Sequence, residues 1–319
     1  MCLAAAVVLL ALALVLKPRR TAPCLPPAGE VIQGDAPFRF AVVGDSRRNA
    51  TVLRRIVKSA EQDGARFLLH LGDIVNRPTR QEFDWVLDTL SGLDSDLPFY
   101  AAPGNHDIVE TEEDPELRSR FYRAAFGPRQ YWFACANCLF VVFDDSNAEY
   151  TAEDLDWLDR TLAGLRSGYE TCFVCMHVPP RDPRPGHSHG LGKRAPELMA
   201  VLKKHDVSAV LAAHIHTYAE DNIDGIPIVI TGGGGSSRVE PILPYHYVLC
   251  SVEGDGSFQV QKKEIGNPLN VSLAGYLFRA WLPTDGLMLL AAALAAAGLL
   301  LAIGRSDRGQ AAGTEADAG

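Results

Sequence analysis

The most constraining feature of this sequence is a repeated order of elements: an apolar run, a small polar loop and an amphipathic segment. Apolar runs of strand length lie at Phe38–Val43, Phe67–Leu71 and Pro98–Ala102. After the first two runs, apolar residues recur at i, i+3, i+4 and i+7 within residues 53–60 and 83–90, which is the spacing of one helix face. This alternation predicts an α/β domain in which helices connect the strands of a sheet.

The later part of the chain is richer in strands than in helices. The segments Tyr131–Phe133 and Leu139–Phe143 predict a hairpin that turns at residues 136–137. Thr151 followed by Asp154 is the pattern of a capping box and predicts the start of a helix. Further strands are expected at Cys172–Met176, Val207–Leu211, Ile226–Ile230, Tyr247–Val252 and Phe258–Lys262.

Polar residues that can bind metals gather where these predicted strands stop. Sites in open α/β sheets lie at the carboxyl ends of the strands, so residues far apart in sequence are expected to converge there. All of them offer oxygen or imidazole ligands, a set that suits Mn, Zn or Fe(II) better than a soft thiolate site. The strand-end residues are Asp45, Asp73, Asn105, His106, His177, His214 and His216.

Five short motifs at these strand ends resemble the motif series of the calcineurin-like metallophosphoesterases, and the resemblance spans about Phe38 to Lys263. It implies a two-layered β-sandwich flanked by helices in α-β-β-α order. It also implies hydrolysis of a phosphate mono- or diester by attack of a metal-bound hydroxide. The motifs are Gly44-Asp45, Gly72 to Arg77, Gly104 to Asp107, Met176-His177 and Ala213 to His216.

The resemblance further implies two adjacent divalent metal ions, for which Mn, Fe and Zn are all candidates. Asp73 would bridge the two ions. The remaining ligands divide into Asp45 and His216 for the first ion and Asn105, His177 and His214 for the second. Two divalent ions with two carboxylates keep a net positive charge, which favours a phosphate dianion.

The same resemblance suggests residues that act on the substrate. His106 lies where the family places a general acid or electrostatic donor for the leaving oxygen, and the neighbouring Asp107 is grouped with it as catalytic. Arg77 could hold a phosphate oxygen through its fork of donors, or form an ordinary surface ion pair. Arg47 and His189 are candidate substrate contacts, although His189 lies in a Pro/Gly/His loop that could equally be a solvated loop.

Two positions depart from the family pattern. The first motif is usually Asp-X-His with the His as a ligand, but here Arg47 stands in that position. Arginine is always protonated and cannot bind a metal, so the first ion keeps three protein ligands and a one-metal state is open. Arg47 could instead contact substrate phosphate or a site carboxylate.

Asn76 stands where relatives with protein phosphatase activity carry an Asp, which disfavours protein phosphatase activity for this chain. The alternative function is a membrane scaffold or signalling protein with impaired metal binding.

Both ends of the chain are strongly apolar. Residues 2–16 carry no charge, which is short for a membrane span but suits a signal peptide or a marginal anchor. Residues 286–304 also carry no charge, and a helix of that length is about 28 Å long, enough to cross a bilayer. A buried core helix is the alternative for this second segment.

The charges around the two apolar segments disagree about the side of the membrane. Arg305 and Arg308 favour a cytoplasmic tail and therefore an external domain, whereas Lys17, Arg19 and Arg20 argue the reverse. We expect a membrane-anchored protein with an extracytoplasmic catalytic domain. The expected organisation is a signal peptide or anchor at 1–20, a linker at 21–36, the metallophosphoesterase domain at 37–265, a linker at 266–285, a transmembrane helix at 286–304 and a disordered tail at 305–319.

Charge and cysteine content limit the partners and the redox chemistry. The net charge is −9, and proteins that bind nucleic acids usually carry a basic face, so no nucleic-acid partner is expected. The family resemblance implies a phosphorylated small-molecule or lipid substrate, and the apolar ends of the chain add a membrane as the second expected partner. Seven cysteines are too few for a disulfide scaffold. Cys135 and Cys138 flank the predicted turn, where a disulfide or a structural zinc site remains open. Cys172 and Cys175 lie three apart in a predicted strand and should face opposite ways.

Overall fold

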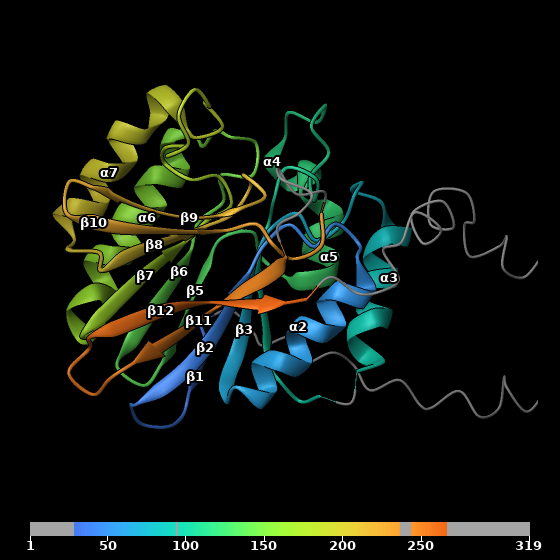
Figure 1. Cartoon of the computed structure of the whole chain (residues 1–319). Helices are drawn as coiled ribbons and strands as arrows, with labels where there is room; N and C mark the ends of the chain where they lie inside the picture. Colours follow the sequence, from blue (N-terminus) through green and yellow to red (C-terminus); the bar gives the residue numbers. More distant parts are fainter. Residues whose placement is uncertain (1–28, 94, 237–243, 267–319) are drawn as a thin grey trace, which may run out of the picture. The chain divides into compact units, whose positions relative to one another are not determined.

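Two β-sheets face each other across an aromatic core, and helices cover both outer faces (Figure 1). The structure is a computed structural model that describes residues 29–93, 95–236 and 244–266. All of these residues belong to one compact unit, Met1–Gly266. The layer order confirms the α-β-β-α sandwich expected from the sequence.

The smaller sheet has five strands in the order β12-β11-β2-β3-β4. Strands β2, β3 and β4 run parallel, whereas β11 pairs antiparallel with both β2 and β12. The bounds are β2 Phe38–Val43, β3 Ala65–Leu71, β4 Phe99–Ala102, β11 Tyr245–Val252 and β12 Phe258–Ile265. The parallel strands need crossover connections, and the helices predicted at 53–60 and 83–90 supply them.

The larger sheet has seven strands in the order β1-β5-β6-β7-β8-β10-β9. Strands β6, β7, β8 and β10 run parallel, and the hairpins β5–β6 and β9–β10 are antiparallel. The bounds are β1 Val31–Ile32, β5 Tyr131–Cys135, β6 Cys138–Val142, β7 Thr171–Cys175, β8 Ala209–Ala212, β9 Tyr218–Ile223 and β10 Ile226–Thr231.

Rings from both sheets form the centre of the sandwich. Phe40 on β2 lies edge-on to Phe140 on β6 at a centroid distance of 5.0 Å, and Phe67 on β3 contacts the same ring at 5.2 Å. Such pairs add to the free energy gained from burying the rings. The contacts fix one sheet against the other and therefore fix the relative positions of the strand ends.

The helices divide between the two outer faces. The five-stranded sheet is covered by α2 Ala50–Gln62, α3 Arg80–Ser91 and α5 Arg120–Phe126. The seven-stranded sheet is covered by α6 Ala152–Leu165 and α7 Ala195–Lys204. The short helices are α4 Pro115–Arg118, η1 Arg166–Gly168 and η2 Gly192–Arg194. The capping box predicted at Thr151 and Asp154 is present at the start of α6.

Two predictions for the cysteines, their side-chain orientation and their pairing, can be compared with the structure. Cys172 points to the helix-covered face and Cys175 to the centre of the sandwich, which confirms their opposite orientation. Cys135 and Cys138 lie opposite each other across the β5–β6 turn. Both carry free thiols in the structure, so the disulfide considered above is not formed there.

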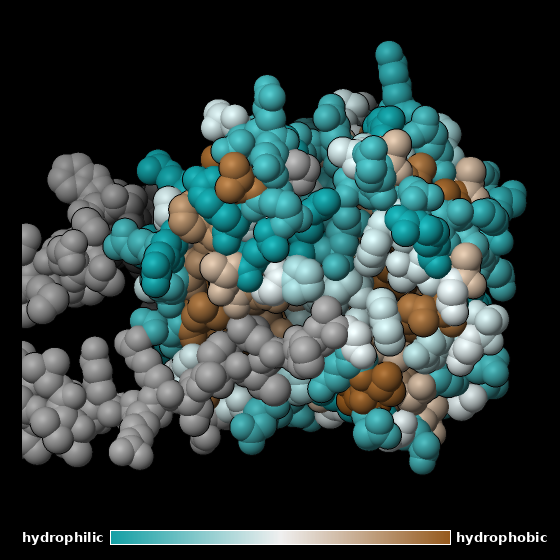
Figure 2. Space-filling model, turned by 180° about the vertical axis from the view of Figure 1, so that it is seen from behind, coloured by the Kyte–Doolittle hydropathy of each residue, from teal (hydrophilic) through white to brown (hydrophobic). Residues whose placement is uncertain are grey.

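The surface is mainly polar where the chain is described. On the face shown in Figure 2, hydrophilic residues dominate and hydrophobic residues form small separate patches. Within the described ranges, no helix is long and apolar enough to cross a membrane. The signal peptide or anchor predicted at 1–20 and the transmembrane helix predicted at 286–304 lie outside those ranges.

Candidate metal centre

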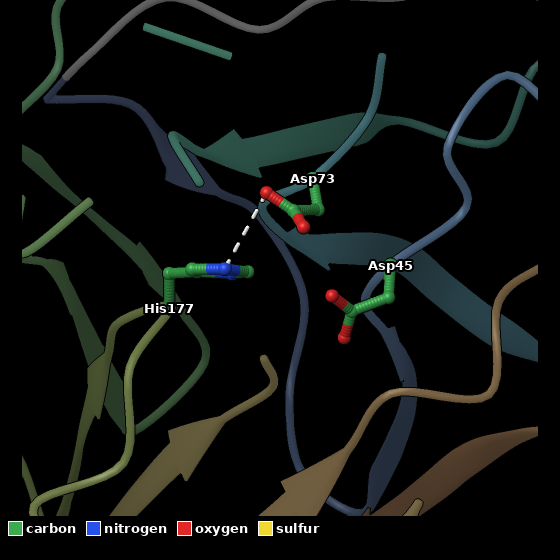
Figure 3. A group of neighbouring side chains, drawn as sticks. All are labelled: Asp45, Asp73 and His177. Atoms are coloured by element: carbon green, nitrogen blue, oxygen red, sulfur yellow. Dashed lines mark ion pairs between the residues drawn. The ribbon is translucent and has the colours of Figure 1, made fainter. Parts of the chain in front are cut away.

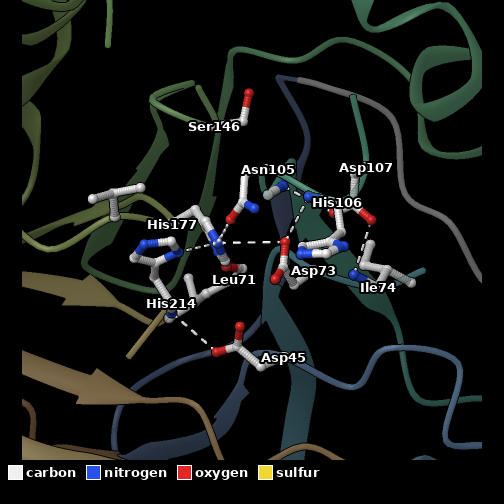
Figure 4. Close-up of polar contacts among 12 residues, drawn as sticks. Asp45, Leu71, Asp73, Ile74, Asn105, His106, Asp107, Ser146, His177 and His214 are labelled. Atoms are coloured by element: carbon white, nitrogen blue, oxygen red, sulfur yellow. Dashed lines mark hydrogen bonds and ion pairs between the residues drawn. The ribbon is translucent and has the colours of Figure 1, made fainter. Parts of the chain in front are cut away.

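Both sheets contribute side chains to one site at the carboxyl edge of the sandwich (Figure 4). The smaller sheet contributes the residues that follow β2, β3 and β4, and the larger sheet contributes those that follow β7 and β8. The six predicted metal ligands are Asp45, Asp73, Asn105, His177, His214 and His216. The convergence expected from the strand ends is therefore found, and it depends on the docking of one sheet on the other.

The backbone turns sharply at four of these ligands. Asp45, Asp73, His214 and His216 have φ values of 60°, 56°, 68° and 50°, a left-handed conformation that costs non-glycine residues roughly 1 kcal/mol or more each. Strain of this kind persists only where the surrounding structure enforces it. Part of the enforcement is the hydrogen bond from the Asp45 N–H to the Gly72 carbonyl, at 3.0 Å.

Glycine at position 104 lets two loops meet. A Cβ atom on Gly104 would lie 2.2 Å from the Asp73 nitrogen and 2.6 Å from Asp73 Oδ1. Because non-bonded contacts of a carbon atom are never that short, any larger residue would displace the loop that carries Asp73. The position of this carboxylate is therefore set by backbone packing as well as by its own conformation.

Four ligand atoms cluster at spacings that suit one metal ion. The Nε2 atom of His177 lies 3.1 Å from Asn105 Oδ1, 3.2 Å from His214 Nδ1 and 3.5 Å from Asp73 Oδ1. Adjacent ligands held at metal–nitrogen and metal–oxygen distances of about 2.1 Å stand about 3 Å or more apart. The His177 Nδ1–H donates to the Leu71 carbonyl at 2.7 Å, so Nε2 is the ring nitrogen directed at these ligand atoms and is available to bind a metal ion.

A second group of ligand atoms lies beside the first. Asp45 Oδ1 and His216 Nε2 are 3.4 Å apart, and both are buried without a hydrogen-bond partner. Buried polar atoms without a partner are destabilising, and a cation would satisfy both. Asp45, Asp73 and His177 together offer ligand atoms within 4.8 Å of one another (Figure 3). The donor set and its spacing therefore fit divalent metal ions.

The electrostatics of the site also favour a cation. Burial lowers the pKa of His177, but the surrounding carboxylates, Asp73 first among them, outweigh burial and raise it overall. Burial raises the pKa of Asp73, yet His177 and Arg47 lower it to about 2. Burial and the charge of His177 lower the pKa of His214 to about 3, so its imidazole is a neutral ligand. Metal ligands must be deprotonated, and Asp73 and His214 meet that condition.

His106 lies beside Asp73 and is oriented by two hydrogen bonds. Its backbone N–H donates to Asp73 Oδ1 at 2.8 Å, and its Nδ1–H donates to the main-chain carbonyl of Asn76 at 2.8 Å. Since Nδ1 carries a proton, Nε2 donates only when the ring is an imidazolium. The side chain of Asn76 is not the group that orients His106, so the exchange of Asp for Asn leaves this contact intact.

Asp107 holds the site from behind rather than facing a substrate. Its carboxylate is fully buried and accepts N–H groups of Ile74, Val75 and Gly104 at 2.8–3.0 Å. Burial, with the charge of Asp73, raises its pKa to about 7. Asp107 is therefore a positioning residue and not the catalytic residue that was predicted. The strand-end pattern identified the residue but did not indicate which way its side chain points.

Asp145 has a similar role and was missed in the sequence analysis. It is buried and accepts the N–H groups of His177 and Val178 at 2.8 and 3.0 Å. Burial raises its pKa to about 7. Asp145 follows β6, so the strand-end rule that identified the metal ligands would also have found this residue.

The three predicted substrate contacts lie in different surroundings. Arg47 donates through Nε and Nη2 to Asp73 Oδ2, at 3.1 and 2.9 Å. Arg77 is exposed, and its backbone N–H is bonded to the carboxylate of Glu82. The side chain of His189 is 61% exposed and lies 3.3 Å from Asp182, with its ring 6.5 Å from that of His214. Arg47 therefore belongs to the metal centre itself.

Residues 38–218 match the family model of the calcineurin-like phosphoesterases. The chain belongs to the calcineurin-like phosphoesterase family. Membership implies metal-dependent hydrolysis of phosphoesters at a site for two metal ions, in agreement with the ligands described above.

One curated protein and two solved structures are similar to this chain. Purple acid phosphatase 21 of Arabidopsis thaliana is 26% identical over 226 residues, which cover 63% of this chain and 51% of the plant protein. The chain thus spans about half of that curated relative. A dimetal phosphatase from Danio rerio has a TM-score of 0.56 at 18% identity, covering 72% of this chain and 97% of that one. Purple acid phosphatase PPD1 from yellow lupin (Lupinus luteus) has a TM-score of 0.58 at 15% identity, covering 73% and 53%. At these identities the two structures show a shared fold.

Proposed function

We propose that this chain is a membrane-anchored, metal-dependent phosphoesterase that hydrolyses a phosphate mono- or diester of a small molecule or a lipid. The observation that carries the proposal is the convergence of six oxygen and imidazole ligands from five strand ends, with spacings that fit divalent ions. When bound, such ions lower the pKa of a water molecule and offset the charge of the phosphate. Manganese, iron and zinc all accept this ligand set.

The residues of the chain would divide the remaining work. The imidazolium of His106 would give its Nε2 proton to the leaving oxygen, with the ring oriented by the Asn76 carbonyl. Arg77 is exposed and would bind a phosphate oxygen through its fork of donors. His189, held near His214 by Asp182, would contact the far side of the substrate.

Metal dependence can be tested directly on the full-length chain. We expect hydrolysis of aryl phosphate monoesters or diesters in the presence of Mn²⁺, Zn²⁺ or Fe²⁺, loss of turnover after chelation and recovery on adding the metal back. Comparing mono-aryl with bis-aryl phosphates would show which ester class is preferred. Full turnover after complete removal of metal would refute the proposal.

The role of His106 can be tested with leaving groups of different basicity. His106→Asn should lower kcat/KM by roughly 100- to 10,000-fold for a poor leaving group such as an alkoxide. The loss should be smaller for a nitrophenolate, which leaves without protonation. His205→Asn is the matched control, because His205 lies away from the metal centre, at the end of α7 on the outer face of the larger sheet. Its Nε2 atom is 2.6 Å from Asp159 Oδ1. Equal losses for both leaving groups would contradict proton donation by His106.

Membrane anchoring is proposed from residues 286–304, which carry no charge and as a helix would be about 28 Å long. The domain is proposed to lie on the extracytoplasmic side, because Arg305 and Arg308 follow that segment. Protease added to intact cells should then cleave the domain. Protection until the membrane is permeabilised would place the domain inside, and full release by an alkaline wash would exclude an integral anchor.

A membrane scaffold on the same fold is the second candidate. It is favoured by one observation, the Arg at position 47, which removes a ligand from the first motif. A scaffold would hold no stoichiometric transition metal and would show no esterase activity with any of the three metals. Metal analysis of the purified full-length chain therefore separates the two functions.

A further inference from the structure

Arg47 occupies one side of the carboxylate that the family uses as a metal bridge. Both of its contacting donors, Nε and Nη2, are directed to the same atom, Asp73 Oδ2. The other oxygen, Oδ1, accepts the His106 N–H and faces His177. In Figure 3 the dashed line joins His177 to one oxygen of Asp73, and the second oxygen points to the side of Asp45. The two oxygens therefore contact different groups: Oδ2 contacts the Arg47 guanidinium, and Oδ1 faces the His177 side of the site.

The contact between Arg47 and Asp73 is held on both backbone and side chain. The Arg47 N–H donates to the main-chain carbonyl of Asp73 at 2.9 Å. The guanidinium is 23% exposed and the Asp73 carboxylate is fully buried. A fork of donors on a buried carboxylate is a strong, directional contact, and breaking it would leave the carboxylate charge without its partner. An incoming metal ion would have to displace a cation that is tethered to the chain.

The side of the site next to Arg47 also has few ligands left. Position 47 supplies no metal donor, and Asp73 Oδ2 is already bonded to the guanidinium. Asp45 Oδ1 and His216 Nε2 remain, whereas protein metal sites of this kind usually offer at least three ligands. The side next to His177 keeps four ligand atoms: His177 Nε2 itself and, within 3.5 Å of it, Asp73 Oδ1, Asn105 Oδ1 and His214 Nδ1.

We propose that the guanidinium of Arg47 takes the place of one of the two family metal ions, so that this chain binds a single ion among Asp73, Asn105, His177 and His214. The inference rests on the proposed metal-dependent function and specifies the composition of its site. With one divalent ion, Arg47 and the two carboxylates Asp45 and Asp73, the centre keeps a net positive charge. It therefore still attracts a phosphate, but part of that charge is permanent and does not depend on metal concentration.

The stoichiometry of bound Mn²⁺ tests this proposal. The full-length chain would be dialysed against Mn²⁺ and analysed by elemental analysis and by electron paramagnetic resonance. We expect one ion per wild-type chain and the spectrum of an isolated Mn²⁺. Arg47→His should restore the missing imidazole and release Asp73 Oδ2, giving two ions per chain and a spin-coupled spectrum. Thermal unfolding of each variant would show that it is folded.

Arg48→His is the matched control. Arg48 also has a positive φ, of 64°, but its guanidinium lies over the Trp85 ring at 4.9 Å and 3.9 Å from Glu82. This variant should bind one ion, as the wild type does. Two ions in the wild-type chain, or a single ion in Arg47→His, would overturn the inference and leave the proposed function standing. Absence of bound metal from every variant would instead overturn the proposed function.

Discussion

Replacing Gly104 with Ala tests whether backbone packing sets the position of Asp73. The new Cβ would lie 2.2 Å from the Asp73 nitrogen, 2.6 Å from its Oδ1 and 2.9 Å from the Gly72 carbonyl carbon. Since carbon and its neighbours pack at about 3.5 Å, the two loops must separate by roughly 1 Å. A misplacement of that size lowers catalytic rates on the order of 100-fold, and overpacking of this kind destabilises by about 1–3 kcal/mol.

The assay combines kcat/KM with any turned-over aryl phosphate, the affinity for Mn²⁺ and urea unfolding. Gly104→Ala should bind Mn²⁺ more weakly and unfold at lower urea. Gly164→Ala is the control, because a Cβ on this exposed residue of α6 meets open space. It should leave binding unchanged and stabilise the helix by about 0.5 kcal/mol. Metal affinity and turnover of Gly104→Ala equal to those of the wild type would refute the argument that this close approach positions Asp73.

Three further predictions concern the polar cluster at the start of α6. Arg129 is 18% exposed and bonds Asp144 at 3.0 Å and Asp154 at 2.8 Å, so Arg129→Met should lower the free energy of unfolding by about 3 kcal/mol in urea; no change would show that the carboxylates are solvated. Burial raises the pKa of Asp154, but the hydrogen bonds from the Thr151 N–H and Arg129 outweigh burial, so the net pKa lies below 3.8. That stability is present above 3.8 and lost as pH falls through the folded pKa, so the advantage of wild type over Asp154→Asn should shrink on acidification below 3.8, and a constant difference would contradict the assignment. Thr151→Ala removes the capping box and should cost about 1 kcal/mol, measured by the same unfolding curves; an unchanged midpoint would show that other groups hold the helix start.

Strongly patterned elements could be predicted from the sequence. Strand β2 has the predicted bounds, Phe38–Val43, because a run rich in Phe and Val directly precedes a glycine. Helix α6 begins at the predicted capping box. Strand β9, Tyr218–Ile223, was missed because its residues are mostly polar and partly exposed. Strand β9 is held by its antiparallel pairing with β10, which the local sequence pattern of β9 does not reveal. Helix α5 was missed because its seven residues are too few for a clear period.

The candidate metal centre likewise has features that the sequence predicted and features that it did not. The strand-end pattern predicted which residues gather, because chain topology brings the carboxyl ends of the strands together. Side-chain direction was not predictable: Asp107 points into the protein interior, and Arg47 contacts Asp73, one of the two partners left open for it. Such directions depend on left-handed turns and on contacts between loops that are distant in sequence, and local spacing carries no information about these.

The position of β2 has a consequence for how the domain must be divided in any experiment. This strand is hydrogen-bonded to β3 on one side and to β11 on the other, with Phe38 opposite Val252 and Val42 opposite Val248. The family match ends at residue 218, before β10, β11 and β12. A fragment cut at that boundary would expose one edge of β2 and one edge of β8, and open strand edges promote aggregation. The segment matched by the family model is therefore shorter than the unit that folds. During synthesis, the smaller sheet can be completed only after β12 has been made.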